Sequence, residues 1–255
     1  MAEAILSLHQ LSHAFGGLKA VDNVSLELPQ YALSALIGPN GAGKTTLFAL
    51  MSGFLKPDSG RVLFLGEDIT GRAPHRNALH GMTRTFQIVQ PFAQQTVREN
   101  IAVGAHLRMK GRRQALERAE IVAQQVGLAP QLDKPAADLT VGGRKRLELA
   151  RALATRPRLL LLDEVLAGLN PAEITEMIPV VRGIAASGVT VLMIEHVMQA
   201  VMNLAQQVWV LAQGQLIAQG TPGEVTRDPR VIEAYLGPGA AARLLAGQAA
   251  SVGAT

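Results

Sequence analysis

The stretch Gly38-Pro39-Asn40-Gly41-Ala42-Gly43-Lys44-Thr45 stands between an apolar run at residues 33–37 and a segment of helical character at residues 46–51. Its first and last glycines lie five positions apart, which lets the backbone wrap with its N–H groups pointing inward. Lys44 can then reach the β- and γ-phosphates of a nucleotide, and the Thr45 hydroxyl can ligate Mg²⁺. A helix that starts here adds the positive end of its dipole to the anion site. The stretch therefore predicts a strand, a phosphate-binding loop and a helix, in that order.

A second buried strand is indicated at residues 159–162, and it ends in two adjacent acids, Asp163 and Glu164. Burying such charges is costly unless a cation or a substrate balances them. Beside the phosphate-binding loop, Asp163 would hold Mg²⁺, directly or through water. Glu164 would polarise the water that attacks the γ-phosphate.

The order of patterns along the chain predicts the fold class. Residues 4–11 and 21–28 alternate as half-buried strands and form an antiparallel opening. Helical spacing of apolar residues begins at about Pro74, and we place an inserted helical subdomain at about residues 88–155. Strands then alternate with helices up to a hairpin at 208–218, which predicts a mainly parallel α/β sheet. We expect one domain over residues 1–237 and a loosely ordered Ala/Gly-rich tail at 238–255.

Composition limits the classes of function. The chain has 255 residues and is 48% apolar, so it can bury a large core, and it has no cysteine for disulfides or thiol chemistry. Its longest apolar runs are far shorter than the ~20 residues that span a bilayer, so we expect it to be soluble or held at a membrane by partners. A net charge of +4 with only 4% aromatic residues argues against a nucleic-acid partner. The basic clusters at 110–113 and 144–146 are interpreted as solvated faces.

Residues 139–147 indicate a second anion site. The stretch offers the Thr140 hydroxyl, two adjacent glycines and the start of another helix. One nucleotide has one triphosphate, and the first loop already binds it. The second site is therefore expected to act across a subunit interface.

These motifs and their order resemble the nucleotide-binding subunit of an ATP-binding cassette (ABC) transporter, and the resemblance extends to about residue 237. The Walker A loop matches residues 38–45, and the Walker B strand with its catalytic glutamate matches residues 159–164. The signature sequence matches Leu139, Thr140, Val141, Gly142 and Gly143. The D-loop matches Ala167, Gly168, Leu169 and Asn170. Gln87 stands at the Q-loop, His196 at the switch histidine, and Phe15 at the adenine-stacking aromatic.

The resemblance implies a P-loop NTPase of ABC type that binds ATP and Mg²⁺. Glu164, His196 and Gln87 would be catalytic, and Thr45, Gln87 and Asp163 would hold the metal. The nucleotide would be bound by Phe15, Gly38, Pro39, Asn40, Gly41, Ala42, Gly43, Lys44, Thr45 and Thr46. Two subunits would sandwich two nucleotides head to tail, with the signature residues acting in trans. The partners would be integral-membrane permease subunits and a second ATPase, at the cytoplasmic face of the plasma membrane.

Three positions depart from the family pattern. Thr140 replaces a serine and keeps the hydroxyl, Gly143 replaces a glutamine and loses the amide, and Val165 replaces a proline. Backbone N–H groups survive such changes, so we expect hydrolysis to persist at an equal or lower rate.

Within the family, the stretches at 15–18, 84–87, 167–170 and 219–236 look like those of branched-chain amino acid importers. Importers of urea or short amides and exporters of lipopolysaccharide-type lipids share this look, so the solute stays open. The identity of the second ATPase, the same chain or a sibling, also stays open. A soluble ABC ATPase of translation or DNA repair is disfavoured because only one Walker A loop and no sustained heptads occur. A P-loop kinase would have no use for the second helix start.

The segment 87–100 joins the predicted Q-loop to the helical insert and carries Val89, Pro91 and Phe92 among polar neighbours. An apolar patch at a joint favours a docking surface. We therefore expect this segment to meet the membrane partner.

Overall fold

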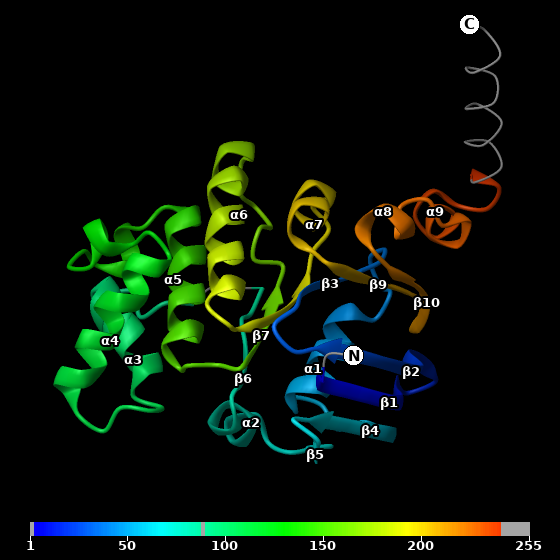
Figure 1. Ribbon diagram of the computed structural model, residues 1–255, viewed down its shortest axis with the longest axis horizontal. Helices are drawn as coiled ribbons and strands as arrows, with labels where there is room; N and C mark the ends of the chain where they lie inside the picture. The colour runs from blue at the N-terminus through cyan, green and yellow to red at the C-terminus, as the bar shows by residue number, and fades with distance from the viewer. Residues whose placement is uncertain (1–2, 88–89, 241–255) are drawn as a thin grey trace, which may run out of the picture.

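The computed structural model describes residues 3–87 and 90–240, which form two β-sheets with helices around them (Figure 1). The smaller sheet has the order β2-β1-β4-β5 and the larger one the order β10-β9-β3-β8-β7-β6. The smaller sheet consists of β1 (Ala4–Phe15), β2 (Leu18–Pro29), β4 (Ser59–Phe64) and β5 (Glu67–Asp68). The larger consists of β3 (Leu33–Ile37), β6 (Met82–Arg84), β7 (Leu159–Asp163), β8 (Thr190–Ile194), β9 (Gln207–Ala212) and β10 (Gln215–Gly220).

Strand directions agree with the predicted fold class. The smaller sheet is antiparallel throughout, and in the larger sheet the pairings are parallel except between β9 and β10. A mainly parallel sheet with an antiparallel N-terminal subdomain is therefore confirmed.

Alternate residues of the central strands face two different apolar cores. In β7, Leu160 and Leu162 pack in a core shared with the helical insert, whereas Leu159 and Leu161 pack in a core shared with the antiparallel sheet. Because successive side chains of a strand point to opposite faces, one run of four leucines serves both cores. All four are fully buried, which explains why the strand lacks polar alternation.

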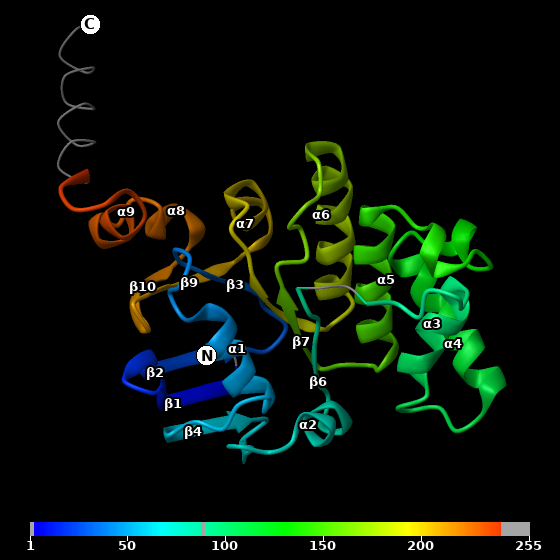
Figure 2. The ribbon, with the colours of Figure 1, turned by 180° about the vertical axis from the view of Figure 1, so that it is seen from behind.

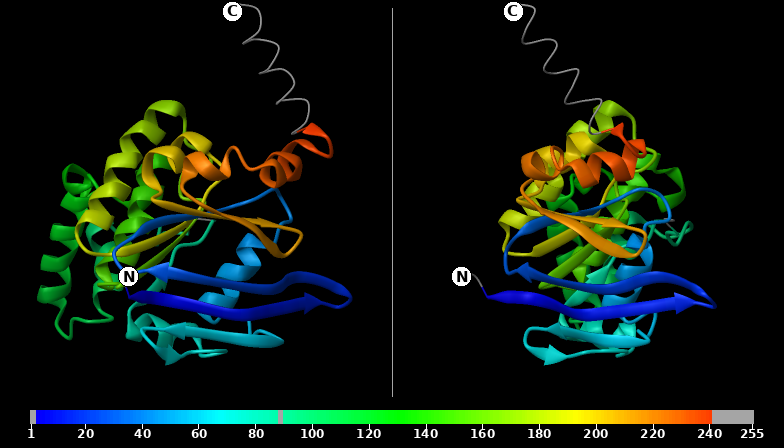
Figure 3. Two further views of the ribbon diagram at one scale, coloured as in Figure 1. Left: turned by 45° about the vertical axis from the view of Figure 1, so that its right-hand side comes forward. Right: turned by 90° about the vertical axis from the view of Figure 1, so that its right-hand side faces the viewer.

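Helix α1 (Lys44–Ser52) lies between the two sheets, as Figure 3 shows. Its Leu47, Phe48 and Met51 belong to the core that contains β1, β2 and one face of the larger sheet. The helix ends at Gly53, whose N–H bonds back to the carbonyl of Leu50. Packing on both sides therefore fixes the direction in which the start of α1 points.

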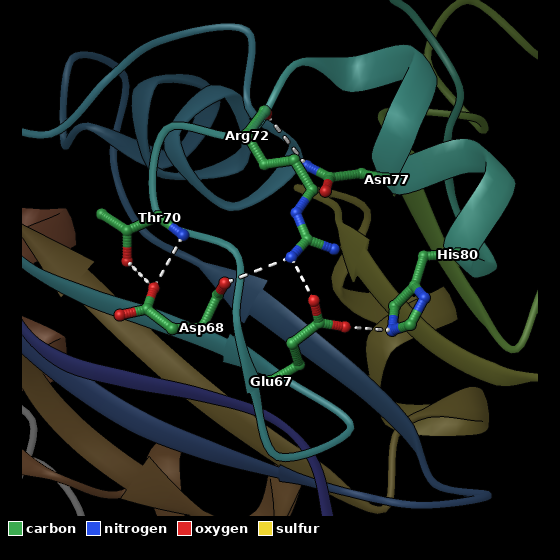
Figure 4. Close-up of polar contacts among 6 residues, drawn as sticks. All are labelled: Glu67, Asp68, Thr70, Arg72, Asn77 and His80. Atoms are coloured by element: carbon green, nitrogen blue, oxygen red, sulfur yellow. Dashed lines mark hydrogen bonds and ion pairs between the residues drawn. The ribbon is translucent and has the colours of Figure 1, made fainter.

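A polar cluster holds the far end of α1 in place (Figure 4). Arg72 contacts Glu67, and Glu67 Oε2 lies 3.1 Å from Nε2 of His80 at the end of α2 (Pro74–His80). Asn77 Nδ2 donates to the carbonyl of Ser52, the last residue of α1, at 3.1 Å. The turn after β5 and helix α2 thus fasten the C-terminal end of the helix that carries the phosphate-binding loop.

The helical insert lies at one end of the molecule (Figure 1, Figure 2). It consists of α3 (Val97–Ala105), α4 (Arg112–Gln125), the short 3₁₀ helices η1 (Ala129–Gln131) and η2 (Ala136–Asp138), and α5 (Val141–Ala154). Buried alanines such as Ala105, Ala119 and Ala150 let these helices approach closely. The limits 88–155 stay a prediction, because residues 88–89 lie outside the described part of the chain.

The expectation that helical structure runs on from Pro74 is wrong for residues 82–84. Helix α2 is followed by β6, which pairs in parallel with β7 from Met82 to Arg84. Three residues are too few for a strand pattern to show in the sequence, and β6 forms because β7 offers its backbone groups for pairing.

The remaining helices follow the larger sheet toward the C-terminus. They are α6 (Pro171–Ala186), α7 (Met198–Leu204), α8 (Pro222–Val225) and α9 (Pro229–Leu236). Of the predicted tail, residues 241–255 lie outside the described residues. No helix within 3–87 and 90–240 is long and apolar enough to cross a membrane.

Candidate functional site

Close backbone packing explains the glycines of the phosphate-binding loop. Gly38 and Gly43 have φ angles of 153° and 102°, a region that side chains disfavour. A Cβ on Gly38 would lie 2.0 Å from the carbonyl oxygen of Leu211, and one on Gly43 would lie 2.2 Å from that of Ala20. Any larger residue would push the loop off β9 and β2, so these two glycines place the start of α1.

The first turn of α1 presents its N–H groups without a side-chain cap. Its N-cap residue, Gly43, has no side chain to accept them. Lys44 is nearly buried, and its Nζ donates to the carbonyls of Gly38 and Pro39 at 2.7 and 2.9 Å. Burial lowers the pKa of this ammonium, while the nearby Glu164 and Asp163 act in the opposite direction. The loop thus combines open donors and a cation that its own carbonyls hold over it.

The predicted nucleotide-binding residues line one cleft of about 1270 Å³. Phe15, half-exposed, stands at this cleft and contacts the His13 ring edge-on at 4.7 Å. Gln87, Glu164 and His196 line the same cleft, as do all loop residues from Gly38 to Thr46. The fold therefore brings residues from five separate parts of the chain to one opening.

Tyr235 of α9 also lines this cleft, and the sequence reasoning missed it. Burial raises the pKa of its phenol. Its place could not be read from the C-terminal sequence alone, because it depends on how α9 packs on β10, the strand that pairs with β9.

Glu164 stands at the centre of a polar triad. Its φ of 49° turns the chain sharply after β7. Its Oε2 accepts a hydrogen bond from Gln87 Nε2 at 2.7 Å, and its Oε1 lies 3.9 Å from His196 Nδ1. A carboxylate held between an amide and an imidazole at a phosphate site has the geometry of a general base for water.

The charge of Asp163 has a partner that the sequence reasoning did not find. Its Oδ2 accepts from Arg84 at 2.7 Å, so a cation of the protein itself balances part of this charge, and the role of Asp163 toward Mg²⁺ stays a prediction. Arg84 ends β6, the strand that the sequence pattern did not show.

The donor set at this point suits Mg²⁺. A smaller cavity is lined by Thr45, Gln87 and Asp163 among others, which provide hydroxyl, amide and carboxylate oxygens. Over residues 3–87 and 90–240 no cluster of three or more His, Cys, Asp or Glu side chains forms a metal cage.

Lys145 corrects the interpretation of the basic cluster 144–146 as a solvated face. Its side chain is buried, and its Nζ donates to the backbone carbonyls of Gln87 and Glu164 at 3.3 and 3.2 Å. Glu148, one turn further along α5, accepts from the N–H of Phe86, and burial raises its pKa. The helical insert is therefore bonded directly to the two segments that carry the predicted catalytic side chains.

Glu195 is a buried acid directly before His196. Its Oε1 accepts from the N–H of Leu166 at 3.0 Å, and its side chain is fully enclosed. Burial, with a smaller contribution from Glu164, raises its pKa to about 7. No pattern in the sequence indicated this burial, because it depends on the distant turn at Leu166.

The second predicted anion site is a helix start, as expected, but it is already capped. Thr140 is the N-cap of α5, and its Oγ1 accepts from the N–H of Gly143 at 3.1 Å. Leu139, Gly142 and Gly143 are buried, whereas Val141 is 54% exposed. Asn170 of the predicted D-loop caps α6 in the same way through Glu173.

The signature stretch lies away from the nucleotide cleft of its own chain. Thr140, Gly142 and Gly143 line a separate cavity with Leu169 and Glu173. Ala167 and Gly168 lie in the turn before them, between Glu164 and α6. One chain therefore presents an open and a capped helix start to different openings.

Comparisons with known proteins agree with this geometry. A family model described as ABC transporter matches residues 21–167, and one described as branched-chain amino acid ATP-binding cassette transporter matches residues 215–238. The high-affinity branched-chain amino acid transport ATP-binding protein LivG of Escherichia coli is 39% identical, covering 93% of this chain and 99% of that protein. The protein BraF of Pseudomonas aeruginosa, described in the same words, is 38% identical over the same shares.

A solved structure shows the same arrangement. It is the ADP conformation of an ATP-binding cassette of an ABC transporter, with 34% identity and a TM-score of 0.84, and the match covers 92% of this chain and all of that one. Sequence, fold and site geometry agree, and the chain belongs to the ABC transporter family as one of its ATP-binding cassettes.

Proposed function

We propose that this chain is the ATP-binding and ATP-hydrolysing subunit of an ABC transporter that imports branched-chain amino acids. The observation that carries the proposal is the single cleft in which the open start of α1 faces the Gln87–Glu164–His196 triad. The relatives named above, with ATP binding and branched-chain amino acid transport in their names, support both halves of it.

Each group in the cleft has a role in this reaction. Phe15 stacks on the adenine, and the N–H groups of the loop and Lys44 hold the phosphates. Thr45, Asp163 and Gln87 would hold Mg²⁺, which would neutralise negative charge on the phosphates. Glu164 takes the proton of the attacking water, while Gln87 donates to its Oε2 and His196 lies on the side of its Oε1.

Two measurements test the proposal. The purified chain is expected to hydrolyse ATP only with Mg²⁺, which phosphate release would report. Cells that lack the gene are expected to lose uptake of labelled leucine, and plasmid-borne wild-type protein, but not a Glu164→Gln variant, is expected to restore it. Unchanged leucine uptake in the deletion strain would refute the solute, and Mg²⁺-independent or absent hydrolysis would refute the enzyme.

We further propose that ATP joins two subunits, with residues 139–143 of one facing the nucleotide of the other. The separate location of the two helix starts supports this, since a nucleotide at α1 leaves α5 of the same chain unused. Val141 is the exposed apolar residue of the stretch and stands in the first turn of α5. A carboxylate there favours the helix of the free subunit but repels a phosphate across the interface.

Val141→Glu is therefore expected to abolish the ATP-dependent dimer of a Glu164→Gln protein while leaving the monomer folded. Val103→Glu is the matched control, an exposed valine on α3. Sedimentation with Mg·ATP distinguishes the two. A dimer that persists in the Val141→Glu protein would mean that the stretch does not face the partner's nucleotide.

The membrane partner is proposed to dock on the segment that follows Gln87. Phe92 is exposed there, and the Arg151 guanidinium lies 5.1 Å from the centre of its ring. Val89 of the predicted patch lies outside the described residues. Crosslinks from a cysteine at Phe92 are expected to reach a permease in membranes, on which the chain would be peripheral at the cytoplasmic face. Crosslinks found only within the ATPase would refute this surface.

A further inference from the structure

Arg84 is an almost buried arginine with one charged partner. Its side chain is 8% exposed, and its terminal nitrogen donates to Oδ2 of Asp163, which is 3% exposed. Its Nε is buried and has no hydrogen-bond partner among the described residues. Burying this charge with one donor unpaired costs free energy, which the ion pair offsets only in part. The cost suggests that the pair has a functional role.

Three aromatic rings surround the guanidinium. The centres of Phe48, Phe54 and Phe86 lie 5.9, 5.8 and 5.6 Å from Cζ of Arg84. Phe54 and Phe86 also contact each other edge to face at 5.4 Å. Such rings attract the cation and exclude water from it, which strengthens the ion pair with Asp163. The position of the guanidinium is therefore fixed from several sides.

Thr85, directly after β6, also holds the backbone at Asp163. Oγ1 of Thr85 accepts from the N–H of Asp163 at 3.1 Å, and the N–H of Thr85 donates to Leu161 at 2.9 Å. Because the ion pair occupies Oδ2, Oδ1 is the oxygen left for the cavity that Asp163 lines together with Thr45. The ion pair and the bond to Thr85 thus restrict the orientation of this carboxylate.

We propose that Arg84 is a positioning residue that orients the Asp163 carboxylate for Mg²⁺. The guanidinium holds one oxygen, the aromatic rings hold the guanidinium, and the second oxygen is presented to the cation beside Thr45. The inference rests on the proposed function, because it takes Mg²⁺ at Asp163 as given. Partners that orient a metal ligand in this way are usually worth about 10–100-fold in metal affinity.

The test measures the affinity of the purified full chain for ADP by calorimetry, with and without MgCl₂. Arg84→Met keeps an apolar stem against the three rings but removes the donor. We expect its affinity for Mg²⁺-free ADP to match wild type, and the gain in affinity from Mg²⁺ to fall by about 10–100-fold. Arg84→Lys keeps the charge without the planar fork and is expected to recover part of that gain.

Arg151 offers a matched control. It lines the same cavity and stacks on an aromatic ring, but its NH1 donates to the carbonyl of Gln90 at 3.0 Å rather than to Asp163. Arg151→Met is therefore expected to keep the full Mg²⁺ gain. In an Asp163→Asn background, Arg84→Met is expected to change the Mg²⁺ gain no further, since the residue acts only through that carboxylate.

Each outcome decides the matter. An unchanged or increased Mg²⁺ gain in a folded Arg84→Met protein overturns the proposal, as does an equal loss in Arg151→Met or a further loss in the Asp163→Asn background. If Arg84→Met fails to fold, Arg84→Lys decides alone, and a wild-type Mg²⁺ gain there overturns it. A wild-type protein without any Mg²⁺ gain would refute the proposed function itself rather than the role of Arg84.

Discussion

Two helix starts in this molecule look alike in sequence and differ in structure. Glycines precede the first turn of α1 and stand within the first turn of α5, and both helices carry lysine or arginine within the first turns. At α1 the N-cap is Gly43, in the left-handed region and without a side chain, so the N–H groups stay open. At α5 the N-cap is Thr140, whose hydroxyl already accepts from Gly143.

The difference separates a helix start that can bind the nucleotide by itself from one that can only add contacts to a nucleotide already bound. Open donors with Lys44 above them can hold a triphosphate without help. A capped helix offers its dipole and an exposed edge, worth about 0.3–1 kcal/mol toward an exposed anion and up to ~2 when partly buried. The α5 start should therefore matter only after α1 has bound its ligand and a second subunit has closed over it.

Glu164→Gln is expected to have the largest effect, because the chemistry is proposed to belong to the α1 side alone. Turnover should fall at least ~10²-fold while ATP still binds. Glu117→Gln, which breaks an exposed pair with Arg113 on α4, is the control and should leave turnover unchanged. Near wild-type phosphate release from Glu164→Gln would mean that Glu164 does not activate the water and that the chemistry cannot be assigned to the α1 side.

Glu195, next to His196 in the chain, is expected to make the stability of the fold depend on pH. Its pKa is raised to about 7 from 4.5, so the folded state keeps a proton that the unfolded state releases in between. This contribution to stability is fully present below about pH 4.5 and is lost as the pH rises through about 7, by up to ~3 kcal/mol. Urea unfolding at pH 5 and pH 8 is expected to show the loss in wild type but a much smaller one in Glu195→Gln. Equal pH dependence in both proteins would exclude Glu195 as its origin.

Lys44→Met addresses the open helix start directly. The substitution keeps most of the buried stem and removes the charged donor. Hydrogen bonds to charged groups are worth ~1.5–3 kcal/mol, so the affinity for ATP should fall about 10- to 100-fold. Calorimetry with ATP measures this affinity. A value within twofold of wild type, which is about 0.4 kcal/mol, would mean that the backbone alone binds the phosphates.

Thr140→Ala is expected to have the smallest effect on binding and to sharpen the contrast most. Losing this cap should lower the free energy of unfolding by about 1 kcal/mol and leave the affinity of the monomer for ATP unchanged. Thr96→Ala is the control, because the Thr96 side chain likewise accepts from an N–H in the first turn of its helix, that of Glu99 in α3. Only Thr140→Ala should also weaken the ATP-dependent dimer, and a drop in monomer affinity for ATP would contradict the division between the two helix starts.

The sequence predicted the α1 side well because its signals are local. The glycine spacing, Lys44 and Thr45 occur within one short stretch, and the acids follow a strand that is apolar throughout. The family and the fold class were confirmed. The roles of the individual site residues stay predictions, although the structure brings Phe15, Gln87, Glu164 and His196 to the cleft of the loop.

What the sequence missed depends on distant contacts. Arg84 and Asp163 are 79 positions apart, and their pairing requires a strand of three residues that has no pattern of its own. Lys145 was interpreted as solvated because it stands between two arginines, and only the carbonyls of Gln87 and Glu164 show why it is buried. Such burial follows from how the helical insert lies on the sheet rather than from any neighbour in the chain.

The four leucines of β7 carry information in their number rather than in their identity. Because they alternate between the two cores, their number sets the side of the sheet to which the next residue, Asp163, turns. Deleting one would still leave a run of leucines, but the residues on one side of the deletion would then point to the opposite face of the sheet. Replacing one of these buried leucines by a smaller residue is expected to cost stability by leaving a cavity, whereas a single in-frame deletion would also turn Asp163 to the other face of the sheet or shift the turn before the strand.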